Sequence, residues 1–142
     1  MKLDDATVGL QIWDTAGSER FLSIGTSFYK GSDCCAITFD VTQASTFRNI
    51  DTWHDEFMRH CGSGNKEIVP FVLIGNKADL KDQRKVEMKE IQQWCQAHEN
   101  APYFETSAKS GIKVGEMFEQ IGLLAIQYRK KAAYIKTCIT FL

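Results

Sequence analysis

Three short polar segments hold most of the residues whose types and spacing could do chemistry. They are Asp14 to Gly17, Asn76 to Asp79 and Thr106 to Lys109. Each segment directly follows a short apolar run of the kind that forms a β-strand. Because ligands of open parallel sheets bind at the edge where the carboxyl ends of the strands meet, we predict that these segments form one site.

The second and third segments have the residue types that recognise guanine. Guanine presents adjacent N–H donors at N1 and N2, and the carboxylate of Asp79 can accept both as charge-assisted hydrogen bonds. Adenine lacks that pair of donors, so a site built on it rejects adenine strongly. Asn76 offers an amide to the other edge of the base, and the aliphatic stems of Lys77 and Lys109 can cover its faces. The backbone N–H of Ala108 can donate to the guanine carbonyl.

The first segment has a chemistry directed at metal and phosphate. Asp14, at the end of a strand, can reach a magnesium ion through water, and Gly17 lets a backbone N–H approach a terminal phosphate. Taken alone, this segment is better explained as a capped turn, and Asn76 to Asp79 is explained equally well as a polar turn without a ligand. The three segments together, each after a predicted strand, favour a nucleotide site.

The elements that must position these segments alternate along the chain. Short apolar runs predict strands at 8–13, 34–41, 68–74 and 103–104. Apolar residues at helical spacing predict helices from Phe47 to Cys61 behind a Ser45 cap, from Met88 to Cys95, and from Val114 to Tyr128. This order predicts an α/β fold, a doubly wound and mostly parallel sheet with helices on both faces.

Composition narrows the classes of function. The 142 residues carry a net charge of −1, which gives no broad basic surface for nucleic acid or for an anionic membrane. The five cysteines include no C-x-x-C pair, which argues against a zinc site or a disulfide framework and favours a reducing cytoplasm. No apolar stretch reaches the roughly 18 residues of a membrane span, so we expect a cytoplasmic protein.

Several motifs resemble one family. Gln11 to Gly17, Glu19 to Phe21, Phe28 to Gly31, Phe39 to Thr42, Gly75 to Asp79 and Glu105 to Lys109 resemble the Ras superfamily and, within it, the Rab GTPases of membrane traffic. The resemblance extends from about Leu10 to about Tyr128. The stretches at 28–35, 94–95 and 102–109 look most like the late-endosomal branch, the Rab-nine and Rab-seven type.

The resemblance implies a guanine-nucleotide switch that hydrolyses GTP and acts in vesicle and endosomal traffic, between late endosomes and Golgi or lysosome. Its ligands would be GTP or GDP and Mg²⁺. Its partners would be Rab effectors, an exchange factor, a GTPase-activating protein and a GDP-dissociation inhibitor, at the cytosolic face of late endosomes. By this resemblance, Asp14 would be the aspartate linked to the magnesium ion, and Gly17 would contact the γ-phosphate. The guanine-binding set would be Asn76, Lys77, Asp79, Ser107, Ala108 and Lys109, and the effector surface would include Trp13, Arg20 and Phe28.

Three departures from the family pattern shape the expectations for this chain. The G-x-x-x-x-G-K-[S/T] phosphate loop, the first strand and the first switch do not occur in the sequence, which implies an N-terminally truncated domain at 1–133. In this fold that strand lies between those at 8–13 and 34–41, so we expect a gap in the sheet and a poorly stable chain. Ser18 stands where the family has a water-orienting glutamine, which implies slow hydrolysis. Residues 134–142 form an atypical apolar tail without a prenylation motif, and we expect membrane association only if the chain is lipidated.

Two other interpretations of the sequence stay open. The chain could be a non-enzymatic interaction module that keeps the surface around Trp13, Arg20 and Phe28 and competes for Rab partners without a nucleotide cycle. It could also be an inactive truncated isoform. Binding of guanine nucleotide that depends on Asp79 separates the switch from both alternatives.

Overall fold

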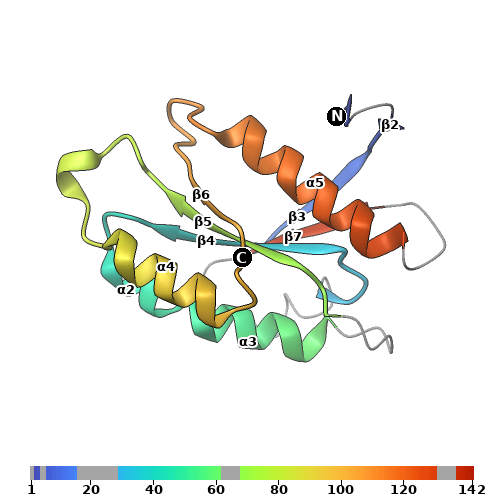
Figure 1. Ribbon diagram of the computed structural model, residues 1–142, viewed down its shortest axis with the longest axis horizontal. Helices are drawn as coiled ribbons and strands as arrows, with labels where there is room; N and C mark the ends of the chain where they lie inside the picture. The colour runs from blue at the N-terminus through green and yellow to red at the C-terminus, as the bar shows by residue number, and fades with distance from the viewer. Residues whose placement is uncertain (1, 4–5, 16–28, 62–67, 131–136) are drawn as a thin grey trace.

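Five parallel strands form the main sheet of the protein, shown in a computed structural model that describes residues 2–3, 6–15, 29–61, 68–130 and 137–142 (Figure 1). In spatial order the strands are β3 (Leu10–Asp14), β7 (Thr137–Phe141), β4 (Cys34–Asp40), β5 (Phe71–Asn76) and β6 (Tyr103–Glu105). All neighbours pair in parallel. Two short strands, β1 (Lys2–Leu3) and β2 (Ala6–Thr7), form a separate antiparallel pair.

Helices cover both faces of the sheet. In Figure 1, α5 (Val114–Lys130) lies over one face, and α2 (Ala44–Arg48), α3 (Ile50–His60) and α4 (Met88–Ala97) lie over the other. A short 3₁₀ helix, η2 (Lys81–Gln83), follows β5. This arrangement confirms the predicted α/β class. Within the described parts of the chain, none of the helices is long and apolar enough to cross a membrane.

The structure has two helices, α2 and α3, where the sequence analysis predicts one from Phe47 to Cys61. The predicted cap at Ser45 is also wrong. Ser45 lies inside α2, whose N-cap is Gln43 without a side-chain cap bond. Thr46 is the hydroxyl residue that bonds this turn, because its Oγ1 donates to the Gln43 carbonyl at 2.7 Å and accepts the Asp40 backbone N–H at 3.0 Å. The start of α2 is therefore fastened to the end of β4.

Strand β7 occupies the position in the sheet where the sequence analysis expects a gap. It lies between β3 and β4, with Ile139 in register with Ile12 on one side and Cys34 on the other. The expectation of an open edge between β3 and β4 is therefore wrong for this structure, because the apolar segment at 137–141 pairs with both strands. The predicted domain boundary at residue 133 lies outside the described residues.

A hydrophobic core lies on each face of the sheet. On the α5 face, Ile139 of β7 packs with buried residues of β4, β5 and α5. These are Cys34, Ala36, Val72, Ile74, Met117, Ile121 and Ala125. The opposite core contains buried residues of β4, β5, α3 and α4, including Ile37, Phe39, Phe57, Leu73 and Ile91. Strands β4 and β5 contribute to both cores, as expected of central parallel strands.

Gly75, near the end of β5, has no room for a side chain. A Cβ atom built there would lie 2.5 Å from the Tyr103 hydroxyl, 3.0 Å from Val41 Cγ1 and 3.2 Å from Phe39 Cζ. The Tyr103 ring has little freedom to move, because its hydroxyl donates to Glu105 Oε1 at 2.9 Å. We expect Gly75→Ala to lower the free energy of unfolding by about 1–3 kcal/mol, the usual cost of overpacking, as measured by urea denaturation.

Gly115, near the start of α5, provides the matched control. A Cβ atom there meets nothing within 4 Å. Gly115→Ala should therefore leave stability unchanged or raise it slightly, because alanine favours a helix more than glycine does. Equal effects of the two substitutions would contradict the steric explanation.

Candidate functional site

The second and third polar segments line one pocket at the carboxyl edge of the sheet. Its volume is about 290 Å³, and its lining residues are Asn76, Lys77, Asp79, Leu80, Ser107, Ala108 and Lys109. The segments follow β5 and β6, which are adjacent parallel strands. A backbone hydrogen bond of 3.0 Å from the Ala78 N–H to the Thr106 carbonyl joins them. The structure therefore brings together the six residues that the sequence analysis assigned to the base.

Asp79 is held in this pocket by Ser107. The Ser107 hydroxyl is fully buried and donates to Asp79 Oδ1 at 2.6 Å, while its Oγ accepts the Ser110 backbone N–H at 3.2 Å. One buried hydroxyl therefore fixes the direction of the carboxylate before a ligand arrives. A carboxylate held in this way is preorganised to accept the paired N–H donors of a guanine edge.

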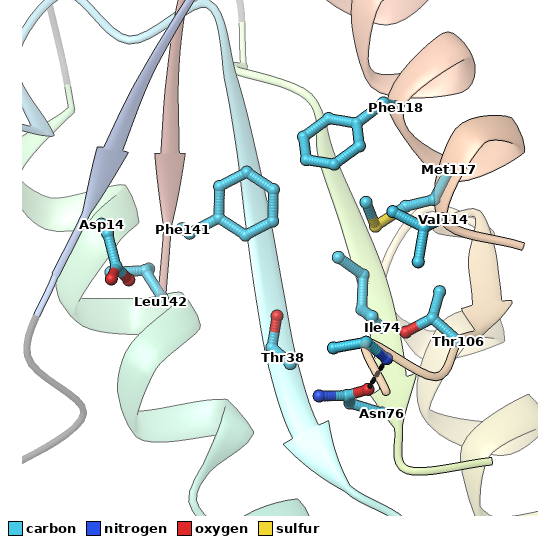
Figure 2. A pocket seen from close by; sticks show the side chains of 11 residues that line it. Asp14, Thr38, Ile74, Asn76, Thr106, Val114, Met117, Phe118, Phe141 and Leu142 are labelled. Carbon is cyan, nitrogen blue, oxygen red and sulfur yellow. Dashed lines mark hydrogen bonds between the residues drawn. The ribbon is translucent and has the colours of Figure 1, made fainter. Parts of the chain in front are cut away.

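Asn76 makes a contact that the sequence analysis did not foresee. Its Oδ1 accepts the backbone N–H of Ala108 at 3.1 Å, a bond drawn from Asn76 in Figure 2. The expectation for Ala108 was that this N–H would meet the carbonyl of guanine. In the structure the N–H is donated to Asn76, so a guanine carbonyl would have to share or replace that bond.

Lys77 has an unusual backbone conformation and a charged partner. Its φ of 65° lies in the left-handed region, which costs energy for a residue with a Cβ. Its Nζ lies 2.6 Å from Asp40 Oδ2, at the end of β4. Asp40 also accepts hydrogen bonds from the Thr42 backbone N–H at 2.8 Å and the Thr42 hydroxyl at 2.7 Å. This network fixes the turn that carries Asn76 and Asp79.

Asp40 makes the stability of the protein depend on pH. Partial burial raises its pKa, but the hydrogen bonds from Lys77 and Thr42 and the charge of Lys77 outweigh burial and lower the pKa below its usual value. A carboxyl whose pKa is lower in the folded state stabilises the fold above the unfolded pKa of about 3.9. This contribution is lost as pH falls from there through the lowered folded pKa.

We therefore expect Asp40→Asn to reduce the loss of stability between pH 7 and strongly acidic pH. Urea denaturation at a series of pH values measures the effect. Asp82→Asn, an exposed carboxylate in η2, is the control and should leave the pH profile unchanged. Parallel pH profiles for the unmodified chain and Asp40→Asn would contradict this role of Asp40.

A larger cavity of about 510 Å³ adjoins the first pocket and shares Asn76 and Ala108 with it. Its wall is mainly apolar and comes from α5, β5 and β7. Figure 2 shows Val114, Met117 and Phe118 of α5 facing Phe141 of β7 across this space, with Asp14 near Leu142 at one side. The remaining lining residues are Thr38, Ile74 and Thr106. Members of all three polar segments, Asp14, Asn76, Thr106 and Ala108, therefore line one cavity.

Asp14 is exposed at the rim of the larger cavity. The backbone N–H and hydroxyl of the next residue, Thr15, donate to the Phe141 carbonyl at 3.3 and 2.7 Å, which fixes the end of β3 beside the end of β7. The polar lining includes the hydroxyls of Thr38 and Thr106. Carboxylate and hydroxyl oxygens are the ligand type that Mg²⁺ prefers, so this lining is compatible in its chemistry with a magnesium ion that keeps most of its waters.

Several predicted residues lie outside the described part of the chain. These are Gly17, Ser18, Arg20 and Phe28, assigned to phosphate, hydrolysis and effectors. Trp13 is described, and it is partly exposed on β3. The sequence analysis missed Asp40, Phe118 and Phe141. No local sequence pattern indicates the contact between Asp40 and Lys77. Phe118 was predicted as part of a helix, but only as a residue that packs in the core.

Comparison with known proteins identifies the family. The sequence model described as the Ras family matches residues 1–127. Ras-related protein Rab-7a of Dictyostelium discoideum is 50% identical over 127 residues, which are 89% of this chain and 63% of that protein. Ras-related protein Rab7 of Drosophila melanogaster is 46% identical over 133 residues, 94% of this chain and 64% of that protein. Ras-related protein Rab-7a of Paramecium octaurelia is 42% identical over 139 residues, 97% of this chain and 68% of that protein.

The chain thus spans less than two thirds of the length of the first two relatives. The match to the family model nevertheless covers most of the chain. Both the motif resemblance and the predicted branch are confirmed by these relatives. The chain belongs to the Ras family and is similar to its Rab7-type members.

Proposed function

We propose that this chain recognises guanine nucleotides and acts as a Rab-type switch protein in vesicle and endosomal membrane traffic. The observation that carries the proposal is the pocket in which buried Ser107 directs the carboxylate of Asp79. That carboxylate would accept the N1 and N2 donors of guanine, and Asn76 would face the opposite edge of the base. Lys77 and Lys109 would cover the faces of the base with their aliphatic stems.

The remaining roles extend the proposal from the base to the nucleotide cycle. Asp14 would hold Mg²⁺ through water, and Gly17 would contact the γ-phosphate. A bound magnesium ion neutralises charge on the phosphates during phosphoryl transfer. Hydrolysis would be slow, because Ser18 is too short to orient water as glutamine does.

The cellular role belongs to the same proposal. The switch would act between late endosomes and Golgi or lysosome, from the cytosolic face of the late endosome. Its partners would be effectors that contact Trp13, Arg20 and Phe28, together with an exchange factor, a GTPase-activating protein and a GDP-dissociation inhibitor. The similarity to Rab7-type proteins supports this assignment.

Titration of the purified chain with fluorescent GDP and fluorescent ADP, with magnesium present, tests the proposal. We expect selectivity for GDP, and we expect Asp79→Ala to weaken GDP binding about a hundredfold. The reason is the loss of two charge-assisted hydrogen bonds, each contributing roughly 1.5–3 kcal/mol before compensation by water. Asp82→Asn, outside the pocket, should bind GDP as the unmodified chain does. Equal affinity for GDP and ADP would refute guanine recognition.

A second candidate function is a non-enzymatic interaction module, and one observation favours it. Among the described residues that line the larger cavity, none carries a positive charge, and Asp14 carries a negative one. Phosphate groups are normally held by cationic side chains and backbone N–H groups. A soluble, folded chain that binds a Rab effector but neither GDP nor GTP would support this candidate.

A further inference from the structure

Lys77 lies between two pockets at the carboxyl edge of the sheet. The first is the guanine pocket, the site of about 290 Å³ that contains Asp79. The second is a cavity of about 300 Å³ whose lining includes the end of β4. Lys77 lines both, whereas Asp40 lines only the second. The contact between Lys77 Nζ and the Asp40 carboxylate therefore lies outside the guanine pocket, while Lys77 still forms part of the pocket wall.

The carboxylate of Asp40 is held in one direction before any ligand binds. Its Oδ1 accepts the backbone N–H and the hydroxyl of Thr42 at 2.8 and 2.7 Å, and its Oδ2 lies 2.6 Å from Lys77 Nζ. The side chain of Asp40 is only 12% exposed, whereas that of Lys77 is 50% exposed. A carboxylate fixed at the end of β4 thus anchors the end of a lysine side chain that is otherwise half in solvent.

An anchored lysine favours binding of a flat base for an entropic reason. Lysine has a flexible four-carbon stem, and ordering such a side chain when a ligand binds lowers the affinity. Because Asp40 holds Nζ in the free protein, much of this ordering precedes binding. The φ of 65° at Lys77 is also unfavourable for a residue with a Cβ, so the ion pair stabilises a backbone conformation that the turn requires.

We propose that Asp40 is a positioning residue for guanine recognition. It holds the ammonium group of Lys77 outside the guanine pocket, so that the aliphatic stem of Lys77 is already placed to cover one face of the base. The inference rests on the proposed recognition of guanine and adds to it a residue that does not line the guanine pocket.

Calorimetric titration of the full chain with GDP, with magnesium present, tests the proposal on Asp40→Asn. We expect this variant to raise the Kd for GDP about three- to tenfold, the effect of having to order one long side chain on binding. Removal of a negative charge would by itself strengthen binding of the phosphates, so net charge does not explain weaker binding. Unchanged or tighter binding of GDP would overturn the inference and leave guanine recognition intact.

Asp33→Asn is the matched control. Asp33 also pairs with a cation, Arg129, and it is buried just before the start of β4, outside both pockets. This variant should destabilise the fold and yet change the Kd for GDP less than about twofold, because the two sites are independent. Equal losses of affinity in the two variants would mean that Asp40 acts only through stability. If the unmodified chain does not bind GDP, the proposed function fails together with the inference.

A double-mutant cycle with Lys77→Met shows whether Asp40 acts through Lys77. Methionine keeps an unbranched apolar stem and carries no charge. In the Lys77→Met background, Asp40→Asn should change the Kd for GDP less than about twofold, because the ion pair is already absent. A full three- to tenfold loss in that background would overturn the inference.

Thr42→Val provides a milder form of the same comparison if circular dichroism shows that Asp40→Asn does not fold. It removes one hydrogen bond to Asp40 Oδ1 and keeps the charge of the carboxylate. We expect Thr42→Val to weaken GDP binding in the unmodified chain and to have no further effect in Lys77→Met. Equal effects in both backgrounds would contradict positioning through Lys77.

Discussion

Ile139→Asp is expected to unfold the chain. Ile139 is fully buried in the middle of β7, between Ile12 of β3 and Cys34 of β4. Its side chain packs against the α5 core, where a carboxylate would have neither water nor a cationic partner among the described core residues. Burying an unpaired charge costs at least several kcal/mol, and the whole fold is stabilised by only about 5–15 kcal/mol.

Ile12→Asp is the matched control, because Ile12 is the register partner of Ile139 on β3 and is 48% exposed. Its carboxylate would remain hydrated, so the loss should be about 1 kcal/mol, the range of strand preference. Circular dichroism and urea denaturation compare the two variants. If Ile139→Asp is as stable as Ile12→Asp, β7 does not lie in the centre of the sheet in solution.

The position of β7 is the main feature of the fold that the sequence analysis did not predict. Thr137, Ile139 and Thr140 are β-branched, so a strand had a local signal. This local signal did not specify the position of the strand in the sheet, because β7 pairs with strands about a hundred residues earlier in the chain. Pairings over such separations depend on which edges the rest of the fold leaves open, and residue types alone do not specify them.

Strands β4 and β5 were predictable for a different reason. A strand buried on both faces appears in the sequence as a continuous apolar run, and the runs at 34–41 and 68–74 have that form. The second predicted strand ends at Ile74, whereas β5 continues to Asn76. Gly75 has no apolar side chain that could indicate a strand. The sheet nevertheless requires glycine there, because the Tyr103 hydroxyl leaves no room for a Cβ atom.

The sequence predicted that the polar segments lie close together, but it did not predict the hydrogen bonds between them. Three polar segments after parallel strands must lie at one edge, and the pockets contain members of all three. The choice of Asn76 as the acceptor for Ala108, and of Asp40 as the partner of Lys77, depends on side-chain geometry across neighbouring strands. Asp40 lies 37 positions before Lys77, so no local spacing connects them.

Arg129→Met is expected to lower the free energy of unfolding by about 3–5 kcal/mol at neutral pH, the usual cost of removing one member of a buried ion pair. Arg129 Nε donates to Asp33 Oδ1 at 2.5 Å, and the side chain of Asp33 is only 6% exposed. The pair connects the last turn of α5 to the residue before β4. Methionine keeps much of the apolar stem of arginine, so the change removes mainly the charge and its hydrogen bonds.

Two comparisons separate this effect from a general loss of arginine. Arg59 makes a pair of the same 2.5 Å length with Glu56, but its side chain is 65% exposed. Because the exposed arginine is little desolvated in this pair, Arg59→Met should cost clearly less than Arg129→Met, even though the side chain of Glu56 is 13% exposed. Adding Asp33→Asn to Arg129→Met should restore part of the stability, because the amide carries no stranded charge. If Arg129→Met costs no more than Arg59→Met, the pair does not fasten α5 to the sheet.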